Sequence, residues 1–232
     1  MTAFSPGNRL IDALESDDRE ALLAQTVVTE FDAGHVFHEP GDSIDHVHFI
    51  EQGIVSAVAV LQDGRTVETV MVGCEGVAGA LAASVPQSAH TRNVAQVAGV
   101  ARRIEASRLR VLVGDRPGLR AVLASYLASL QAELEQSSAC NALHRADQRF
   151  AKWLLRCHDR VKGASFNLTQ EYLATMLGSQ RTTVNEAAQA LQKSGAISYS
   201  RGRITVLDRA ALERVACECY RAADTFRWSP KR

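Results

Sequence analysis

The feature that most constrains the fold is the segment 168–192, LTQEYLATMLGSQRTTVNEAAQALQ, whose apolar residues follow the spacing of two short helices. Thr169 is expected to cap the first helix, because its hydroxyl can accept a hydrogen bond from a free backbone N–H of the first turn. Gly178 supplies the permissive backbone that a sharp turn needs. Three apolar side chains of the first helix share one face: Leu173, Met176 and Leu177. The pattern predicts two packed helices joined by a tight turn.

The second helix is expected to start near Ser179 and to end before Gly195, a residue type that suits the position after a helix end. Its inward face would consist of Val184, Ala187, Ala188 and Leu191. Its outward face carries reaching polar side chains: Gln180, Arg181, Thr182, Asn185 and Glu186. A helix-turn-helix that places its second helix in the DNA major groove needs such a face. An ordinary pair of packed helices has the same periodicity, so only the flanking sequence can distinguish a DNA-binding helix-turn-helix from such a pair.

The flanking sequence favours DNA binding. Residues 196–207, AISYSRGRITVL, follow directly and read as two short strands with Gly202 at the tip. A helix-turn-helix followed by a basic hairpin is a winged helix. Arg201 and Arg203 at the tip are expected to contact DNA phosphates.

The distribution of charge supports this interpretation. The formal net charge of the 232 residues is zero, but residues 1–144 carry 10 Lys and Arg against 18 Asp and Glu, and residues 145–232 carry 16 against 8. The second part is therefore basic, as expected for a DNA-binding module. The acidic part should be repelled by DNA and is expected to do another job.

The acidic part itself changes character along the chain. Residues 9–26 read as helical, and residues 27–105 read as short strands broken by turns at intervals of roughly ten residues, which suggests an all-β barrel or roll. Asp63-Gly64, between two alternating apolar segments, is a strong signal for a two-residue hairpin. The sequence thus predicts a β-roll after an N-terminal helix.

A long helix is expected over 117–144, where apolar residues repeat every three or four positions from Leu119 to Leu134. It could pair with the same helix of a second subunit, or its apolar stripe could cover the β-domain, and both can hold. A two-fold dimer would predict a palindromic DNA site with half-sites about one helical turn apart. The predicted division is a β-roll sensor over 1–115, a dimerisation helix over 116–144 and a winged helix over 145–232, an α+β fold.

This order of elements resembles the cyclic-AMP receptor/FNR (Crp/Fnr) family of bacterial transcription factors. The most specific match is LATMLGSQRTTVNEAAQALQKSGAISYSRGRI, similar to the family's L-A-x-x-L-G-x-x-R-x-T-V signature with its G-x-I and R-G wing. FDAGHVFHEPGD and FIEQGIVSAV resemble β-roll elements of the family more loosely. The resemblance implies sequence-specific DNA binding by a homodimer, regulation of transcription with possible contact to RNA polymerase, and a signal transmitted from the roll through the long helix.

The resemblance also implies roles for single residues. Arg181 matches the arginine that reads a base edge, and an arginine can donate two hydrogen bonds to guanine. Thr182 and Glu186 depart from the family pattern, so the preferred DNA sequence should differ. Glu186 either accepts from cytosine N4 or holds Arg181 in place. Four further residues are candidates for phosphate contact: Thr169, Gln170, Ser179 and Thr183.

The sensor segment departs most from the family. The segment that would bind a cyclic nucleotide is 79–93, with candidate ligand residues Gly79, Ala80, Leu81, His90 and Thr91. Ala80 stands where a glutamate would hold the ribose, and His90-Thr91 stand where an Arg-Ser pair would hold the phosphate. Losing the arginine removes a fixed bidentate charge match. The protein is therefore expected not to bind cyclic AMP in the usual way, and its effector stays unknown; DNA binding without any effector is an alternative.

The histidines and cysteines bear on other sensor chemistries. No cysteine precedes Cys74, so the N-terminal cluster ligands of oxygen-sensing relatives are missing. His46 and His48 share one face of an expected strand and partly match the metal motif of cupins, so a metal- or haem-sensing β-domain is the alternative function. Cys217 and Cys219 were expected on one helix, diverging by about 200°, and therefore to pack rather than to chelate.

The remaining expectations are absences. The sequence has no arrangement of nucleophile, base and acid and no phosphate-cradling glycine loop, so we expect no enzyme activity, no cofactor and no bound metal. No apolar run reaches the roughly 18 residues of a membrane span. With no targeting pattern and an odd number of cysteines, the protein is expected in the cytoplasm.

Overall fold

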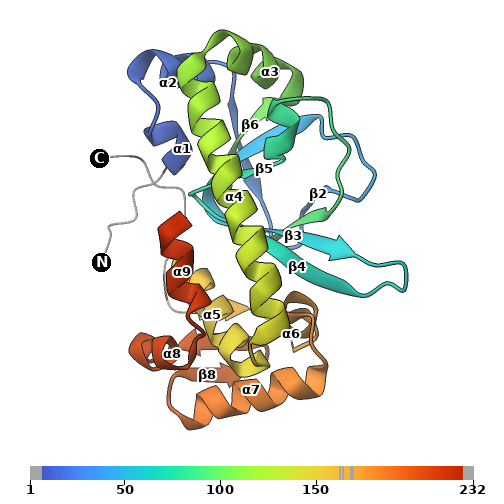
Figure 1. The fold of residues 1–232 in the computed structure, drawn as a ribbon, viewed down its shortest axis with the longest axis vertical. Helices are drawn as coiled ribbons and strands as arrows, with labels where there is room; N and C mark the ends of the chain where they lie inside the picture. The colour runs from blue at the N-terminus through green and yellow to red at the C-terminus, as the bar shows by residue number, and fades with distance from the viewer. Residues whose placement is uncertain (1–6, 162, 164, 168–169, 227–232) are drawn as a thin grey trace. The chain divides into compact units, whose positions relative to one another are not determined.

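The computed structural model describes residues 7–161, 163, 165–167 and 170–226 (Figure 1). The chain divides into two compact units. Unit 1 holds the described residues of 1–57 and 70–132, and unit 2 holds those of 58–69 and 133–226. In the described part of the chain, no helix is both long and apolar enough to cross a membrane.

Unit 1 is built on one antiparallel sheet, and it confirms the predicted β-roll. The strands are β1 (Val27–Phe31), β2 (Val36–His38), β3 (His46–Val60), β4 (Thr66–Val72), β5 (Val77–Ala78) and β6 (Arg92–Glu105). The main path runs β1-β6-β3-β4, with β2 paired to β6 and β5 paired to β3. A 3₁₀ helix, η1 (Ala80–Ala83), lies between β5 and β6.

The N-terminal segment forms two short helices, α1 (Arg9–Asp12) and α2 (Ser16–Leu23), where the sequence suggested one continuous helix. Asn8 caps α1, its side chain accepting from the N–H groups of Leu10 and Ile11. The Arg19 guanidinium donates to the carbonyls of Ile11, Asp12 and Leu14. These carbonyls leave the helical pattern because a side chain satisfies them, so the helix breaks there.

The β3–β4 hairpin also differs from expectation. The N–H of Gly64 donates to the carbonyl of Leu61 at 2.9 Å, and the N–H of Leu61 donates to the carbonyl of Arg65 at 2.8 Å. Gly64 has φ +82°. This is a three-residue connection in which a turn is followed by a left-handed glycine, and not the predicted two-residue hairpin.

The long helix α4 (Pro117–Leu143) follows α3 (Ala106–Asp115) and has the predicted extent. Leu119, Leu123 and Tyr126 are buried in the main apolar core of unit 1. The Tyr126 hydroxyl accepts from the N–H of Val77 at 3.1 Å. The predicted apolar stripe therefore packs on the β-domain of its own chain, while the opposite face of α4 is exposed and consists largely of small residues, among them Ala121, Ala124 and Ala128.

Unit 2 contains the predicted helix-turn-helix and wing. Its helices are α5 (Ala146–His158), α6 (Gln170–Leu177), α7 (Arg181–Lys193), α8 (Arg209–Val215) and α9 (Cys219–Phe226). Its strands are β7 (Ser165–Asn167), β8 (Ile197–Ser200) and β9 (Arg203–Val206), in the order β7-β9-β8. The sequence reading did not predict β7, which completes the small sheet. All seven residues predicted to face inward from the two helices are buried, from Leu173 to Leu191.

Candidate nucleic-acid interface

The turn between α6 and α7 is fixed by backbone hydrogen bonds and by one arginine. Gly178 has φ +56°, and the N–H of Ser179 donates to the carbonyl of Ala174 at 3.0 Å. From α5, the Arg149 guanidinium donates to the carbonyl of Leu177 and to the hydroxyl of Ser179, both at 3.0 Å. Sequence reasoning missed Arg149, since nothing in its spacing links it to a turn thirty residues later.

The outward face of α7 is polar and accessible. Gln180, Arg181, Thr182 and Glu186 are exposed, and Thr183 and Asn185 are half-buried. The helix begins at Arg181, two residues later than expected, because Gln180 has extended backbone. Gln180 makes no side-chain hydrogen bond to the first turn of α7. A helix N-terminus presents N–H groups and positive potential, which suit a phosphate.

Two residues predicted to contact phosphate, Thr169 and Gln170, lie wholly or partly outside the described part of the structure. Thr169 lies outside the described residues. Gln170 is the first residue of α6, and its side chain lies outside the described part of the structure. Ser179 is described, and its hydroxyl accepts from Arg149 while donating to the carbonyl of Leu177 at 3.2 Å.

The wing consists of β8, β9 and the connecting residues Arg201 and Gly202. Ser200 pairs with Arg203, and both connecting residues have positive φ, 50° at Arg201 and 75° at Gly202. Two consecutive residues of positive φ are typical of a tight hairpin turn whose twist matches the strands. The side chains of Arg201 and Arg203 are exposed.

A groove separates the second half of α7 from the wing. It is lined by Asn185, Gln189, Gln192, Tyr199, Ser200, Arg201 and Gly202. The Gln192 amide donates to the carbonyl of Tyr199 at 3.3 Å. Gln189 and Gln192 were not among the predicted residues, although they follow Asn185 at steps of four and three, which place them on its face.

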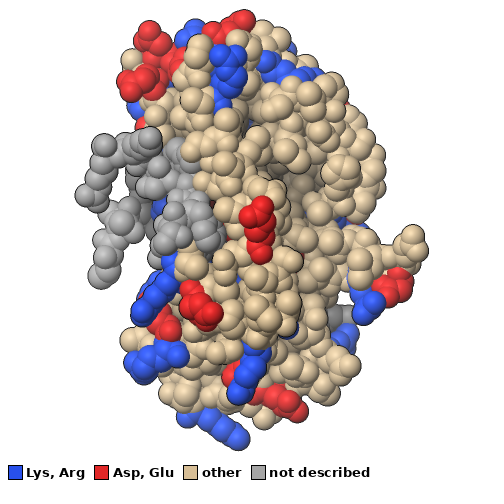
Figure 2. All heavy atoms as spheres, in the orientation of Figure 1, with Lys and Arg blue, Asp and Glu red and all other residues tan. Residues whose placement is uncertain are grey.

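Basic side chains are frequent on unit 2. Residues 145–232 carry 16 Lys and Arg against 8 Asp and Glu, and Figure 2 shows basic and acidic side chains interspersed on the face in view. Arg181 and Lys193 mark the two ends of α7, and both are exposed. This distribution gives the positive field that attracts a nucleic acid backbone.

Comparison with known proteins identifies the family. Residues 148–215 match the model of the Crp-like helix-turn-helix domain, and residues 28–116 match that of the cyclic nucleotide-binding domain. The chain belongs to the Crp/Fnr family. Its members with this helix-turn-helix are DNA-binding transcription regulators, and so is this protein.

Individual Crp/Fnr relatives resemble nearly the whole chain. The CRP-like cAMP-activated global transcriptional regulator of Mycobacterium tuberculosis is 25% identical over 216 residues, covering 89% of this chain and 96% of the relative. The structure of FixK2 from Bradyrhizobium japonicum has a TM-score of 0.70 at 18% identity and covers 83% of this chain and 98% of that one. The c-di-GMP responsive global regulator CLP of Xanthomonas campestris has a TM-score of 0.67 at 16% identity, with coverages of 84% and 100%.

The residues predicted from the sequence as candidate ligand contacts lie around η1 and at the start of β6. Gly79 has φ +79° and precedes the helix, Ala80 is buried, and Leu81 is 51% exposed. His90 is exposed and Thr91 is half-buried. The nearby Arg92 forms an ion pair with Glu39, at 2.8 Å between Nε and Oε2. Arg92 is therefore paired with a carboxylate in this structure.

Two histidines of unit 1, His38 and His48, are buried, whereas His35 and His90 are exposed. Burial lowers the pKa of His48 to about 3 and also lowers that of His38. The ring centroids of His46 and His48 are 6.5 Å apart, and those of His38 and His48 are 6.4 Å apart. Over the described residues, no group of three or more potential metal ligands was found in unit 1, whereas one was found in unit 2.

Proposed function

We propose that this Crp/Fnr regulator acts as a homodimer that binds a palindromic DNA site. In this proposal α7 enters the major groove and the wing contacts the adjacent backbone. The observation that carries the proposal is the exposed polar face of α7, which ends in a groove lined on the wing side by Arg201. Helix-turn-helix proteins read base edges with such a face.

The proposed contacts fall into two classes. Arg181, in the first turn of α7, reads a base edge, and Thr182, Asn185 and Glu186 lie close enough along the helix to contribute. The sugar-phosphate backbone of DNA is proposed to be contacted by Arg201 and Arg203 of the wing and by five residues of the helix-turn-helix: Thr169, Gln170, Ser179, Gln180 and Thr183. Because the hydroxyl of Ser179 already accepts a hydrogen bond from Arg149, Ser179 is proposed to act mainly by fixing the position of the turn, and less by contacting DNA directly.

The dimer is proposed to form along α4. The apolar stripe of this helix is used inside unit 1, so a second copy would meet the opposite face. Small side chains such as Ala121, Ala124 and Ala128 on that face allow two helix backbones to approach closely. We retain 1–115, 116–144 and 145–232 as the proposed sensor, dimerisation and DNA-binding regions.

The sensor is proposed to work without cyclic AMP bound in the usual way. The substitutions at Ala80 and His90 remove the ribose and phosphate contacts, and Arg92 is paired with Glu39. One relative is named as cAMP-activated and another as c-di-GMP responsive, so effectors differ among proteins of this fold. We propose that the effector of this protein is an unidentified small molecule, or that it needs none. The protein is proposed to act in the cytoplasm, to contact RNA polymerase and to have no enzymatic activity.

The alternative of a metal- or haem-sensing roll finds no support in unit 1. A metal ion needs several ligand atoms that converge within a few ångströms. The separated histidine rings do not provide this arrangement among the described residues.

The proposal is tested by selecting bound sequences from random duplex DNA with the purified protein, without and then with cyclic nucleotides. A palindromic motif without ligand supports a dimer that needs no effector. Enrichment only with cyclic AMP would overturn the proposed degenerate pocket. A non-palindromic motif would overturn the dimer, and no motif under any of these conditions would overturn DNA binding without an effector.

A further inference from the structure

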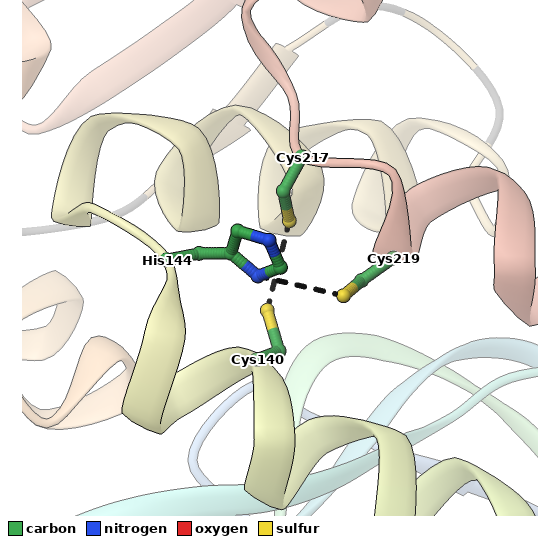
Figure 3. A group of neighbouring side chains, drawn as sticks. All are labelled: Cys140, His144, Cys217 and Cys219. Atoms are coloured by element: carbon green, nitrogen blue, oxygen red, sulfur yellow. Dashed lines mark hydrogen bonds between the residues drawn. The ribbon is translucent and has the colours of Figure 1, made fainter.

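Four side chains that are far apart in the sequence meet in unit 2: Cys140, His144, Cys217 and Cys219 (Figure 3). Cys140 lies near the end of α4, and His144 follows one helical turn later, just beyond that helix. Cys217 lies in the link between α8 and α9, and Cys219 is the first residue of α9. One ligand atom from each residue lies within 4.8 Å of all the others.

The expectation that Cys217 and Cys219 diverge on a helix is wrong. The helical geometry ends at Val215 and resumes only at Cys219. Because Cys217 has no helical neighbours, its side chain and that of Cys219 turn toward the same point, as Figure 3 shows. The end of α4 supplies the other two ligands at the i, i+4 spacing that puts them on one helix face.

Two of the distances between ligand atoms match those around a single tetrahedral ion. Bond lengths of about 2.3 Å to sulfur and about 2.0 Å to nitrogen separate two sulfur ligands by about 3.8 Å, and a sulfur from a nitrogen by about 3.6 Å. The Sγ atoms of Cys140 and Cys217 lie 3.6 Å apart. Cys219 Sγ and His144 Nδ1 also lie 3.6 Å apart.

Outer contacts orient these ligands. Nε2 of His144 lies 3.1 Å from a carboxylate oxygen of Glu218, which fixes the ring with Nδ1 toward the sulfurs. Nζ of Lys152 donates to Cys140 Sγ at 3.1 Å, and the Gln136 amide donates to Cys219 Sγ at 3.0 Å. Carboxylate support of a ligating histidine is a common feature of zinc sites.

Burial and charge agree with an ion at this point. The three cysteines are between 0% and 3% exposed and form a small cluster of their own. Three thiolates and one divalent cation leave a net charge of −1, which the ammonium group of Lys152 offsets. A Cys140–Cys217 disulfide would use only two of the thiols and would give neither Cys219 nor the His144–Glu218 pair a role.

We propose that unit 2 binds one zinc ion through Cys140, His144, Cys217 and Cys219. Four protein ligands leave no open position, so the site is structural. It joins the end of α4 to the start of α9. An iron–sulfur cluster is the rival occupant, but several iron atoms would set their ligands farther apart than one ion does.

The first test is the metal content of the full-length protein purified without added metal. We expect about one zinc per chain by mass spectrometry, with little iron and no acid-labile sulfide. Removing the metal with a chelator under reducing conditions and adding Co²⁺ should give a tetrahedral cobalt spectrum with sulfur-to-cobalt charge transfer. Failure to bind either ion stoichiometrically would overturn the proposal, and stoichiometric iron with sulfide would overturn the assignment of zinc.

Variants locate the ion. Cys219→Ser and His144→Ala should lose most of the zinc and unfold at lower temperature, whereas Cys74→Ala and Cys157→Ala, two buried cysteines outside the group, should keep it. Glu218→Gln keeps all four ligands and should weaken zinc affinity by roughly 10- to 100-fold. This milder variant keeps the test informative if the ligand variants fail to fold. Full zinc content and unchanged affinity in all three site variants would place the ion elsewhere and refute the proposed site.

Discussion

Arg181 and Arg203 should differ in the kind of DNA affinity they supply. Arg181→Ala should lose about 1–3 kcal/mol of discrimination at one position of each half-site, because a bidentate contact to a base edge is removed. Arg203→Ala should weaken binding to all sequences alike and flatten the dependence on salt, because a phosphate contact releases counterions. Binding assays on a panel of single-base variants at two salt concentrations separate the two. Uniform loss for Arg181→Ala would refute its base-reading role.

His48 should make the protein sensitive to acid. Burial lowers its pKa from 6.5 to about 3, and its Nδ1 has no hydrogen-bond partner among the described residues. Between these two pH values the unfolded chain binds a proton that the folded chain does not, so the free energy of unfolding must fall as the pH is lowered through this window.

The measurement is urea unfolding of wild type and His48→Leu at pH 7 and pH 5. The stability lost on acidification should be smaller in His48→Leu, since the titrating group is gone. His90→Gln, which changes an exposed histidine, serves as the control and should behave as the wild type does. Parallel losses in His48→Leu and wild type would show that His48 is not the group responsible.

The wing turn places an arginine where most residues are strained. Arg201 has φ 50°, in the left-handed region. An L-residue in this region is less stable by about 1–2 kcal/mol, a penalty that glycine does not have. Arg201→Gly should therefore raise the free energy of unfolding by up to about 1 kcal/mol while weakening DNA binding on all sequences. Thermal unfolding and binding assays measure the two effects separately.

Arg203→Gly is the matched control for this prediction. Arg203 lies in a strand, where glycine lowers stability, so the control should lose DNA affinity and stability together. If Arg201→Gly also lost stability, the turn would not be the source of strain. If it kept full DNA affinity, the charge at the wing tip would not contact the backbone.

The elements that were predicted correctly from sequence are those with strong local signals. The helix α7 carries its own apolar period from Val184 to Leu191 and its own stop at Gly195, which has φ 74°. The wing is marked by alternation around Gly202. In these places a few neighbouring residues determine the conformation, so reading the sequence locally is enough.

The elements that were missed depend on partners distant in the chain. β7 is three residues long and exists by pairing with β9, in which Arg203, the partner of Asn167, lies 36 positions later in the chain. The end of α1 is set by the Arg19 side chain, and the turn before α7 by Arg149. The convergence of Cys140 with Cys217 likewise requires α4, α8 and α9 to be folded. No periodicity within one segment contains that information.

The two units divide the work of the molecule by charge and by structure. The acidic residues 1–144 include the sheet with the buried His38 and His48, and the basic residues 145–232 carry the helix-turn-helix and the wing. The proposed zinc ligands come from both parts of the sequence, Cys140 and His144 from the first and Cys217 and Cys219 from the second. The helix α4 is continuous across both, since unit 1 includes its residues up to Ala132 and unit 2 begins again at Glu133. The strands β3 and β4 also continue from unit 1 into unit 2, whose residues include 58–69, so the chain links the two units along α4 and along this hairpin.

The proposed dimer gives this helix a second use, which can be tested on the whole protein. Ala128 is exposed on the small-residue face of α4, opposite the stripe that packs into unit 1. Ala128→Glu should leave folding intact but place two like charges in the helix pair, so the dimer should dissociate. Sedimentation should then report a monomer, and affinity for a full palindrome should fall to that for a single half-site.

Val111→Glu is the control, because it adds the same charge at a residue that is 64% exposed on α3 in the same unit. It should remain dimeric with full affinity for the palindrome. A dimeric Ala128→Glu would exclude this face of α4 as the interface, even if the protein still binds a palindrome. If the wild type sediments as a monomer both alone and on DNA, the dimer is excluded altogether. There would then be no two-fold symmetry in the protein to predict paired half-sites one helical turn apart.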